Sequence, residues 1–172
     1  MSRHAADDPG TAVRRLVRWL VTGWVRPGWL VPLQGAAMVG HLLPGGPAVR
    51  LPAAVRAAGV VGLAGGIALS TASATSLGSE LTPATTPREG AQLRTEGPYA
   101  LSRHPLYAGL LVASLGAVLL RGRLSTVVSA VGLAAVLHVK ALEEDRALAG
   151  LFGERYEAYR ARVPRLLGLP GR

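Results

Sequence analysis

Two short polar stretches hold most of the side chains of this chain that could take part in chemistry. The first, residues 96–107 (EGPYALSRHPLY), places Tyr99, Arg103, His104 and Tyr107 where an apolar segment begins. Pro105 is expected at the first position of a helix, where an N–H is not needed. Arginine can bind a carboxylate, a tyrosine face can meet a cation, and histidine can transfer a proton. Residue types alone equally allow Arg103 and His104 to anchor a helix end at lipid headgroups.

The second stretch, residues 143–165 (EEDRALAGLFGERYEAYRARVPR), opens with three consecutive acids, Glu143, Glu144 and Asp145. One interpretation makes these acids solvated partners of nearby arginines. The other has one of them bind the ribose hydroxyls or the amino group of a cofactor. Tyr156 and Tyr159 are three residues apart and so share a helix face, a spacing more typical of packing than of catalysis.

Long uncharged windows separate these stretches and predict membrane spans. No Asp, Glu, Lys or Arg occurs in residues 27–49 or 57–79, and a helix of about 20 residues crosses the hydrocarbon core. Gly62 and Gly66 form a GxxxG pair that favours close helix packing. Residues 106–120 and 124–139 predict a hairpin, which gives about four transmembrane helices in an all-α, polytopic membrane protein. The alternative is a buried helical hairpin in a soluble bundle.

The ends of the chain complete the predicted organisation. Residues 141–163 repeat apolar side chains at intervals of three and four, which predicts a C-terminal amphipathic helix, kinked at Gly153, that folds back over the loop. Residues 1–26 are expected to form a basic N-terminal tail or interfacial segment, and residues 27–172 a single membrane domain. The hairpin is expected to bring the two polar stretches together at one face of the membrane.

The charge distribution predicts the orientation of the spans. The chain carries a net charge of +9, and four spans would place 15 of its 19 Lys and Arg on one side and 4 on the other. The positive-inside rule then puts both termini and the polar stretches in the cytoplasm, as in a bacterial plasma-membrane protein. Basic residues without interleaved aromatics argue against a nucleic-acid partner. The chain has no cysteine, which excludes thiolate metal ligands, and no metal site is expected.

The two stretches together resemble the isoprenylcysteine carboxyl methyltransferase family, which is related to the phospholipid N-methyltransferases. Residues 97–109 (GPYALSRHPLYAG) are similar to its first signature block, and residues 143–165 to its second, with the expected hairpin between them. The resemblance implies a helical membrane methyltransferase domain over residues 27–172, with its C-terminal amphipathic helix covering a cytoplasmic-side pocket for S-adenosylmethionine. It also implies a lipophilic or small-molecule methyl acceptor that arrives from the membrane lipids.

The resemblance implies a role for each matched residue. In the first block, His104 and Tyr107 with the backbone around Pro105 would hold S-adenosylmethionine, and Tyr99 and Arg103 would close the pocket. In the second block, Glu143 or Glu144 would contact the nucleoside or the methionyl amine, and Arg162 and Glu154 would act catalytically by orienting the acceptor. The family often has a second acid where this chain has Arg155, so an acid pair there is not expected.

The resemblance favours methyl transfer from S-adenosylmethionine to a carboxylate, an O-methylation that needs alignment more than a base. A phospholipid or other amine, a thiol and a hydroxyl remain alternatives, for which His104 or Glu154 would be the candidate base. A non-enzymatic small membrane protein is the other class. A soluble dinucleotide-binding fold is disfavoured, because the glycine-rich residues 59–66 lack the preceding strand and the acid about 20 residues later.

Overall fold

A computed structural model of the chain describes residues 29–78, 81–82, 90 and 92–166. These residues form helices and connecting turns, with a single β-bridge between Ala48 and Arg123 and no strand. The elements are α2 (Leu30–Gly40), α3 (Ala53–Leu77), the 3-10 turn η2 (Gly97–Ala100), α4 (Pro105–Arg121), α5 (Leu124–Phe152) and α6 (Glu154–Arg160). The predicted all-α class is confirmed for this part of the chain, and the predicted tail of residues 1–26 lies outside it.

Two of the described helices are long and apolar enough to cross a membrane. These are α3, with 25 residues, and α5, with 29. At 1.5 Å per residue α3 is about 37 Å long, more than the hydrocarbon core requires. The helices α2 and α4 are shorter, with 11 and 17 residues. Pro44 and Pro47 follow α2, and the residue before a proline disfavours the helical conformation, so α2 occupies only part of the predicted window. Four spans therefore stay a prediction.

Glycines set the close packing of α3 against α4. Gly59 and Gly66 of α3 are buried against Gly109 and Gly116 of α4. A Cβ on Gly66 would lie 2.5 Å from the carbonyl oxygen of Gly109, and a Cβ on Gly116 would lie 2.7 Å from that of Gly59. The predicted GxxxG pair is thus half right, because Gly62 has room for a Cβ. The close approach uses glycines seven residues apart, two turns of each helix.

The C-terminal third differs from its predicted organisation. Residues 124–139 and 141–163 were expected as a span followed by a separate amphipathic helix, but α5 runs without a break to Phe152. No proline interrupts the residues between, and Gly153 ends the helix with a φ of +53°, a conformation that glycine adopts at little cost. The short helix α6 follows directly, so the expected kink at Gly153 is a full helix end.

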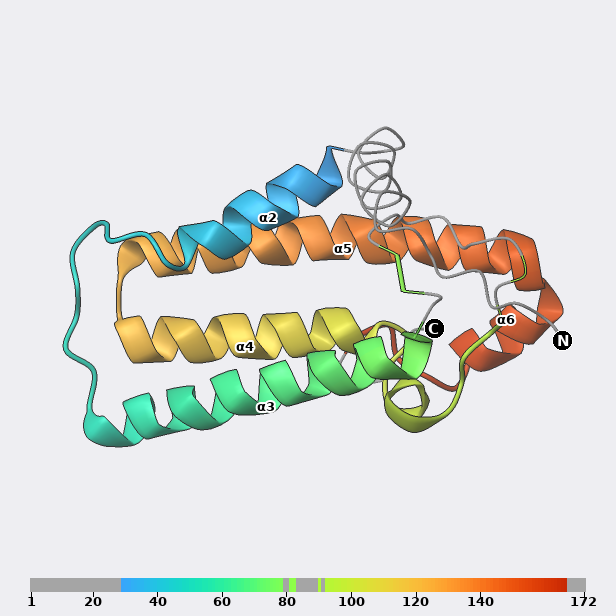
Figure 1. The fold of residues 1–172 in the computed structure, drawn as a ribbon, viewed down its shortest axis with the longest axis horizontal. Helices are drawn as coiled ribbons and strands as arrows, with labels where there is room; N and C mark the ends of the chain where they lie inside the picture. Colours follow the sequence, from blue (N-terminus) through green and yellow to red (C-terminus); the bar gives the residue numbers. More distant parts are fainter. Residues whose placement is uncertain (1–28, 79–80, 83–89, 91, 167–172) are drawn as a thin grey trace, which may run out of the picture.

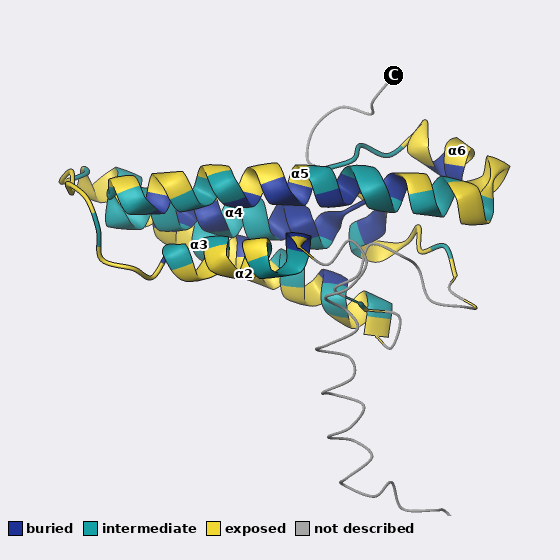
Figure 2. Ribbon diagram, turned by 90° about the horizontal axis from the view of Figure 1, so that it is seen from above, coloured by how far each residue is buried: buried dark blue, intermediate teal, exposed yellow. Residues whose placement is uncertain are grey.

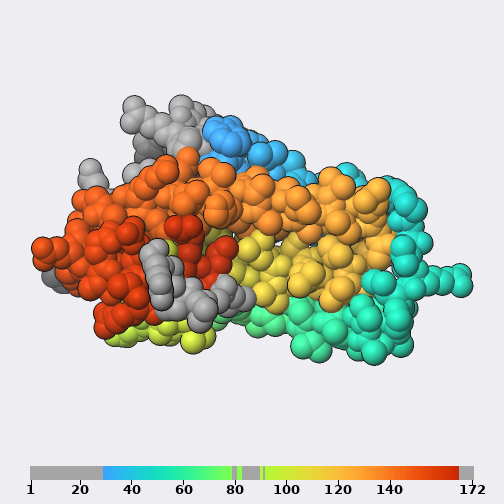
Figure 3. Space-filling view, turned by 180° about the vertical axis from the view of Figure 1, so that it is seen from behind, coloured from blue at the N-terminus to red at the C-terminus, as the bar shows by residue number. Residues whose placement is uncertain are grey.

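The helices pack as an elongated bundle with two different ends (Figure 1). The helix α4 lies between α3 and α5, α2 crosses α5, and the buried residues concentrate along α4 and the facing side of α5 (Figure 2). Tyr107 of α4 packs there against Leu133, Leu137 and Ala141 of α5. One end, here called the turn end, consists of residues 41–52 and 121–123. The opposite end carries α6 and the end of α5, as Figure 3 shows from behind.

Candidate active site

Asp145 joins the two polar stretches at the end of the bundle that carries α6. Its carboxylate accepts hydrogen bonds from Arg103 Nη2 at 3.0 Å and from His104 Nε2 at 2.7 Å, both in the first stretch. From the second stretch Arg165 Nε donates at 2.8 Å, and the Tyr156 hydroxyl also donates. The Asp145 side chain is only 6% exposed. The expectation that the helical hairpin brings the two stretches together is therefore confirmed.

Backbone carbonyls of the C-terminal segment also accept hydrogen bonds from the first stretch. The Arg103 and His104 N–H groups donate to the carbonyls of Pro164 and Arg165 at 2.9 and 3.1 Å. The Tyr159 hydroxyl donates to the Tyr99 carbonyl at 2.6 Å. Burial raises the pKa of Tyr159 to about 12, although the nearby Arg103 opposes the shift, so this hydroxyl stays a donor at neutral pH. Tyr159 is thus a packing and positioning residue, as its spacing from Tyr156 predicts.

His104 donates from both ring nitrogens to carboxylates. Its Nδ1 lies 3.1 Å from Glu144 Oε2, and its Nε2 lies 2.7 Å from Asp145 Oδ1. Burial lowers the pKa of His104, but the hydrogen bonds and charges of Asp145 and Glu144 outweigh it, so the pKa is raised above its ordinary value of 6.5. An imidazolium that donates from both nitrogens has no lone pair left to accept a proton. His104 therefore holds two acids in place and does not suit a general base.

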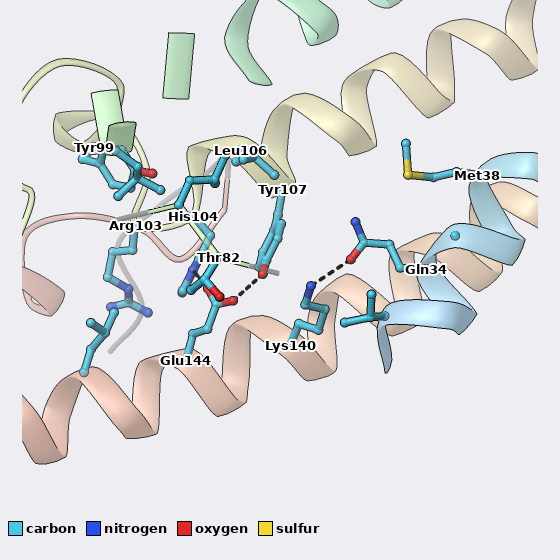
Figure 4. Close-up of a pocket in the computed structure, with 15 residues that line it drawn as sticks. Gln34, Met38, Thr82, Tyr99, Arg103, His104, Leu106, Tyr107, Lys140 and Glu144 are labelled. Atoms are coloured by element: carbon cyan, nitrogen blue, oxygen red, sulfur yellow. Dashed lines mark hydrogen bonds and ion pairs between the residues drawn. The ribbon is translucent and has the colours of Figure 1, made fainter. Parts of the chain in front are cut away.

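A cavity of about 470 Å³ opens beside these groups. Its lining includes the polar residues Gln34, Thr82, Tyr99, Arg103, His104, Tyr107, Lys140 and Glu144 (Figure 4). Most of the remaining lining is apolar: Val31, Met38, Leu77, Leu81, Leu106 and Leu148. The volume lies within the range of about 300–1,000 Å³ that is usual for small-molecule sites. Glu144 and Leu148 of the predicted C-terminal helix line the cavity, whereas no described residue of α6 does. The helix α2 also contributes to the wall, which the sequence did not predict.

The aromatic and acidic side chains of the cavity are linked to one another. The Tyr107 hydroxyl donates to Glu144, and the Tyr107 ring is stacked on His104 with 5.7 Å between ring centroids. Tyr99 also lines the cavity, and burial raises its pKa. The lining of the cavity thus combines a carboxylate, two aromatic rings and the Arg103 guanidinium.

Sequence reasoning missed three polar residues of the cavity, Lys140, Gln34 and Thr82. Lys140 is 3% exposed, its Nζ donates to Gln34 Oε1 at 2.9 Å, and the ammonium lies 5.3 Å from the centroid of the Tyr107 ring. The sequence does carry a signal for Lys140. It is the single lysine of the chain, and it lies one helical turn before Glu144. No local sequence pattern identifies Gln34, which reaches the site only because α2 crosses α5 (Figure 1).

The remaining predicted site residues lie outside the cavity lining. Pro105 is buried at the first position of α4, as predicted. Glu143 does not line the cavity, and its buried Oε2 has no hydrogen-bond partner among the described residues. Glu154 and Arg162 are exposed, and Arg162 Nε donates to the Ala158 carbonyl at 3.1 Å. Of the two acids left open by the sequence, Glu144 is the one in the cavity.

Comparison with known proteins relates this helical chain to methyltransferases. The family model described as phospholipid methyltransferase matches residues 54–155, and the chain belongs to this family. It is also 37% identical, over 73 residues, to the protein-S-isoprenylcysteine O-methyltransferase of Schizosaccharomyces pombe. The match covers 42% of this chain and 31% of that protein. The family relationship inferred from the two signature blocks is confirmed.

Proposed function

We propose that the chain transfers the methyl group of S-adenosylmethionine to a carboxylate of a lipophilic or small acceptor at the membrane. The observation that carries the proposal is the 470 Å³ cavity in which the two signature blocks meet, with Arg103, Lys140 and Glu144 in its lining. S-adenosylmethionine would supply a methyl group on a positively charged sulfur. The residues of the chain would bind, align and desolvate the two reactants.

The donor set of the cavity fits this cofactor. Arg103 Nε is buried and has no hydrogen-bond partner among the described residues, so it can donate to the cofactor carboxylate. Glu144 can accept from the methionyl amine or the ribose hydroxyls. The face of Tyr99 offers cation–π contact to the sulfonium. His104 would act indirectly, by fixing Glu144 through its Nδ1.

Lys140 supports a carboxylate over an amine as the acceptor. A buried ammonium attracts an anionic acceptor and repels a cationic one. An amine or thiol would also need a base, and His104 has both ring nitrogens donating to acids. A carboxylate acceptor is already a nucleophile at neutral pH and needs no proton removed. Lys140 is thus the candidate acceptor-binding residue, a role that the sequence assigned to Arg162 and Glu154.

The cavity is proposed to face the cytoplasm of a bacterial cell, with both termini on that side. Arg50, Arg121 and Arg123 lie at the opposite, turn end, and Arg56 lies beside it in the first turn of α3. The remaining 15 Lys and Arg belong to the termini, the loop and the segments around the cavity. This imbalance follows the positive-inside rule. Such a placement gives the cavity access to a water-soluble cofactor and to lipid.

Binding of S-adenosylmethionine to the detergent-solubilised chain, measured by calorimetry, tests the cofactor. Glu144→Gln is expected to weaken binding by roughly 10- to 100-fold, the effect of losing a hydrogen bond to a charged group. Glu143→Gln is the matched control, because Glu143 is the adjacent acid and lies outside the cavity lining. No binding by folded wild-type chain, or equal losses in both variants, would contradict the proposal.

A second experiment tests the acceptor. Labelled methyl groups are transferred to a panel of prenylated thiol acids, phospholipid amines and small thiols, and the products are treated with alkali, which releases methanol from esters and leaves methylated amines intact. Alkali-labile products are expected, with Lys140→Met raising the KM for the acceptor and Lys140→Arg retaining activity. Alkali-stable products alone would favour the amine or thiol alternative.

A further inference from the structure

A second cavity of about 430 Å³ lies next to the first, toward the turn end of the bundle. Its lining comes from α2 and the two residues after it, and from α3, α4 and α5: Met38, His41, Leu42, Leu63, Ile67, Leu110, Ala113, Ser114, Ala117, Leu120, Arg121 and Leu133. Met38 lines both cavities, so the second one continues along α4 from the proposed active site. Apart from His41, Ser114 and Arg121 the lining is apolar, which suits a hydrocarbon chain.

Two of the three polar side chains in this cavity satisfy each other. His41 Nδ1 donates to the Ala37 carbonyl at 2.8 Å, so its Nε2 can accept from the Ser114 hydroxyl at 2.6 Å. His41 and Ser114 are 8% and 6% exposed. This pair fastens α2 to α4 and leaves no strong donor in the middle of the cavity.

Arg121 is different, because its charge has no acidic partner in the part of the chain that the structure describes. Its Nη2 lies 3.4 Å from the carbonyls of Leu42 and Leu43, at the long end for a hydrogen bond. Its Nε is buried and has no partner among the described residues. The sequence contains no Asp or Glu between Asp8 and Glu80 or between Glu96 and Glu143. No carboxylate therefore lies in the segments that form the turn end, and an anion from outside the chain would complement this guanidinium.

We propose that this cavity binds one acyl chain of an anionic phospholipid, whose phosphate contacts Arg121. The acyl chain would run along α4 toward Met38, and the phosphate would lie at the membrane surface of the turn end. Exposed apolar side chains on the neighbouring helices, Val61 of α3 and Val128 of α5 among them, are consistent with lipid around this part of the bundle. The phosphate supplies the missing negative charge, and the chain fills an apolar space that water would occupy unfavourably. This site is independent of the proposed methyl transfer.

Lipid binding to the full chain tests the proposal. The detergent-purified, delipidated protein is titrated with phosphatidylglycerol or with phosphatidylcholine of the same acyl chains, and bound lipid is counted by native mass spectrometry. Phosphatidylglycerol is expected to bind at least roughly tenfold more tightly, and Arg121→Gln is expected to remove that preference. Arg50→Gln is the matched control, because Arg50 is exposed at the same end and does not line the cavity. It should leave the affinity within about twofold.

Two further arms make the result decisive. Ala117→Phe places a ring in the cavity and is expected to abolish tight phosphatidylglycerol binding, with far-UV circular dichroism confirming that the variant is folded. Glycerol phosphate, the headgroup without chains, is expected not to bind measurably. The proposal is overturned by equal affinity for the two lipids, by equal losses in Arg121→Gln and Arg50→Gln, or by tight binding of glycerol phosphate alone. Unchanged phosphatidylglycerol affinity in folded Ala117→Phe would place the lipid elsewhere and overturn it as well.

Discussion

Replacing Asp145 by asparagine should loosen the whole end of the bundle that holds the cavity. The substitution keeps the size of the side chain and removes its charge. Asp145 accepts hydrogen bonds from Arg103, His104, Arg165 and Tyr156. An asparagine retains a single acceptor oxygen, and its NH₂ group would face donors.

The magnitude follows from the burial of the partners. The Arg103 and His104 side chains are 3% and 4% exposed, whereas that of Arg165 is 35% exposed and is screened by solvent. Removing one member of a buried ion pair destabilises a protein by about 3–5 kcal/mol. For a chain of 172 residues each kcal/mol lowers Tm by about 2–4 °C, so a drop of roughly 6–20 °C is expected.

Thermal unfolding in detergent, followed by circular dichroism at 222 nm, measures this drop. Glu157→Gln is the matched control, because Glu157 pairs with Arg160 at 3.0 Å while both side chains are 49% exposed. An exposed pair of this kind contributes about 0–1 kcal/mol. If Asp145→Asn melted within about 2 °C of the wild type, the four contacts of Asp145 would not be what joins the two signature blocks.

Three other predictions concern the helix packing, the buried histidine and the cavity. Gly66→Ala should lower the free energy of unfolding by about 1–3 kcal/mol, because the added Cβ forces α3 away from α4. Gly65→Ala, which has nothing within 4 Å of its added Cβ, should be neutral. Equal melting temperatures for the two variants would contradict this. The pKa of His104 is raised, so the charged imidazolium stabilises the fold fully below about pH 6.5, and this stabilisation is lost as the pH rises through the raised pKa. The Tm difference between wild type and His104→Gln should therefore shrink in alkaline buffer. A difference that grew with pH would refute the direction of the pKa shift. Tyr107→Phe removes the hydroxyl that contacts Glu144 and should weaken S-adenosylmethionine binding more than stability, which parallel calorimetry and melting would check.

Much of the site could be anticipated because its signals are local in the sequence. Pro105 fixes the start of α4, and the uncharged window fixes most of α3. The first block places Tyr99, Arg103, His104 and Tyr107 together, and all four line the cavity. The sequence also assigned roles to Glu154 and Arg162 of the second block, but both residues are exposed, so their positions do not support these roles. The sequence pattern cannot tell which side of a helix faces a cavity.

The sequence by itself determined the helical class, the apolar segments and the family, since these depend on composition and on residues close along the chain. The tertiary structure decided where each of the three acids lies. Successive residues of a helix point about 100° apart, so the rotation of α5 against α4 turns Glu144 into the cavity and Asp145 onto Arg103 and His104, with Glu143 outside the cavity lining. It likewise brought Gln34 to Lys140 across 106 residues. Contacts between distant segments depend on how whole helices pack, and no local pattern encodes that.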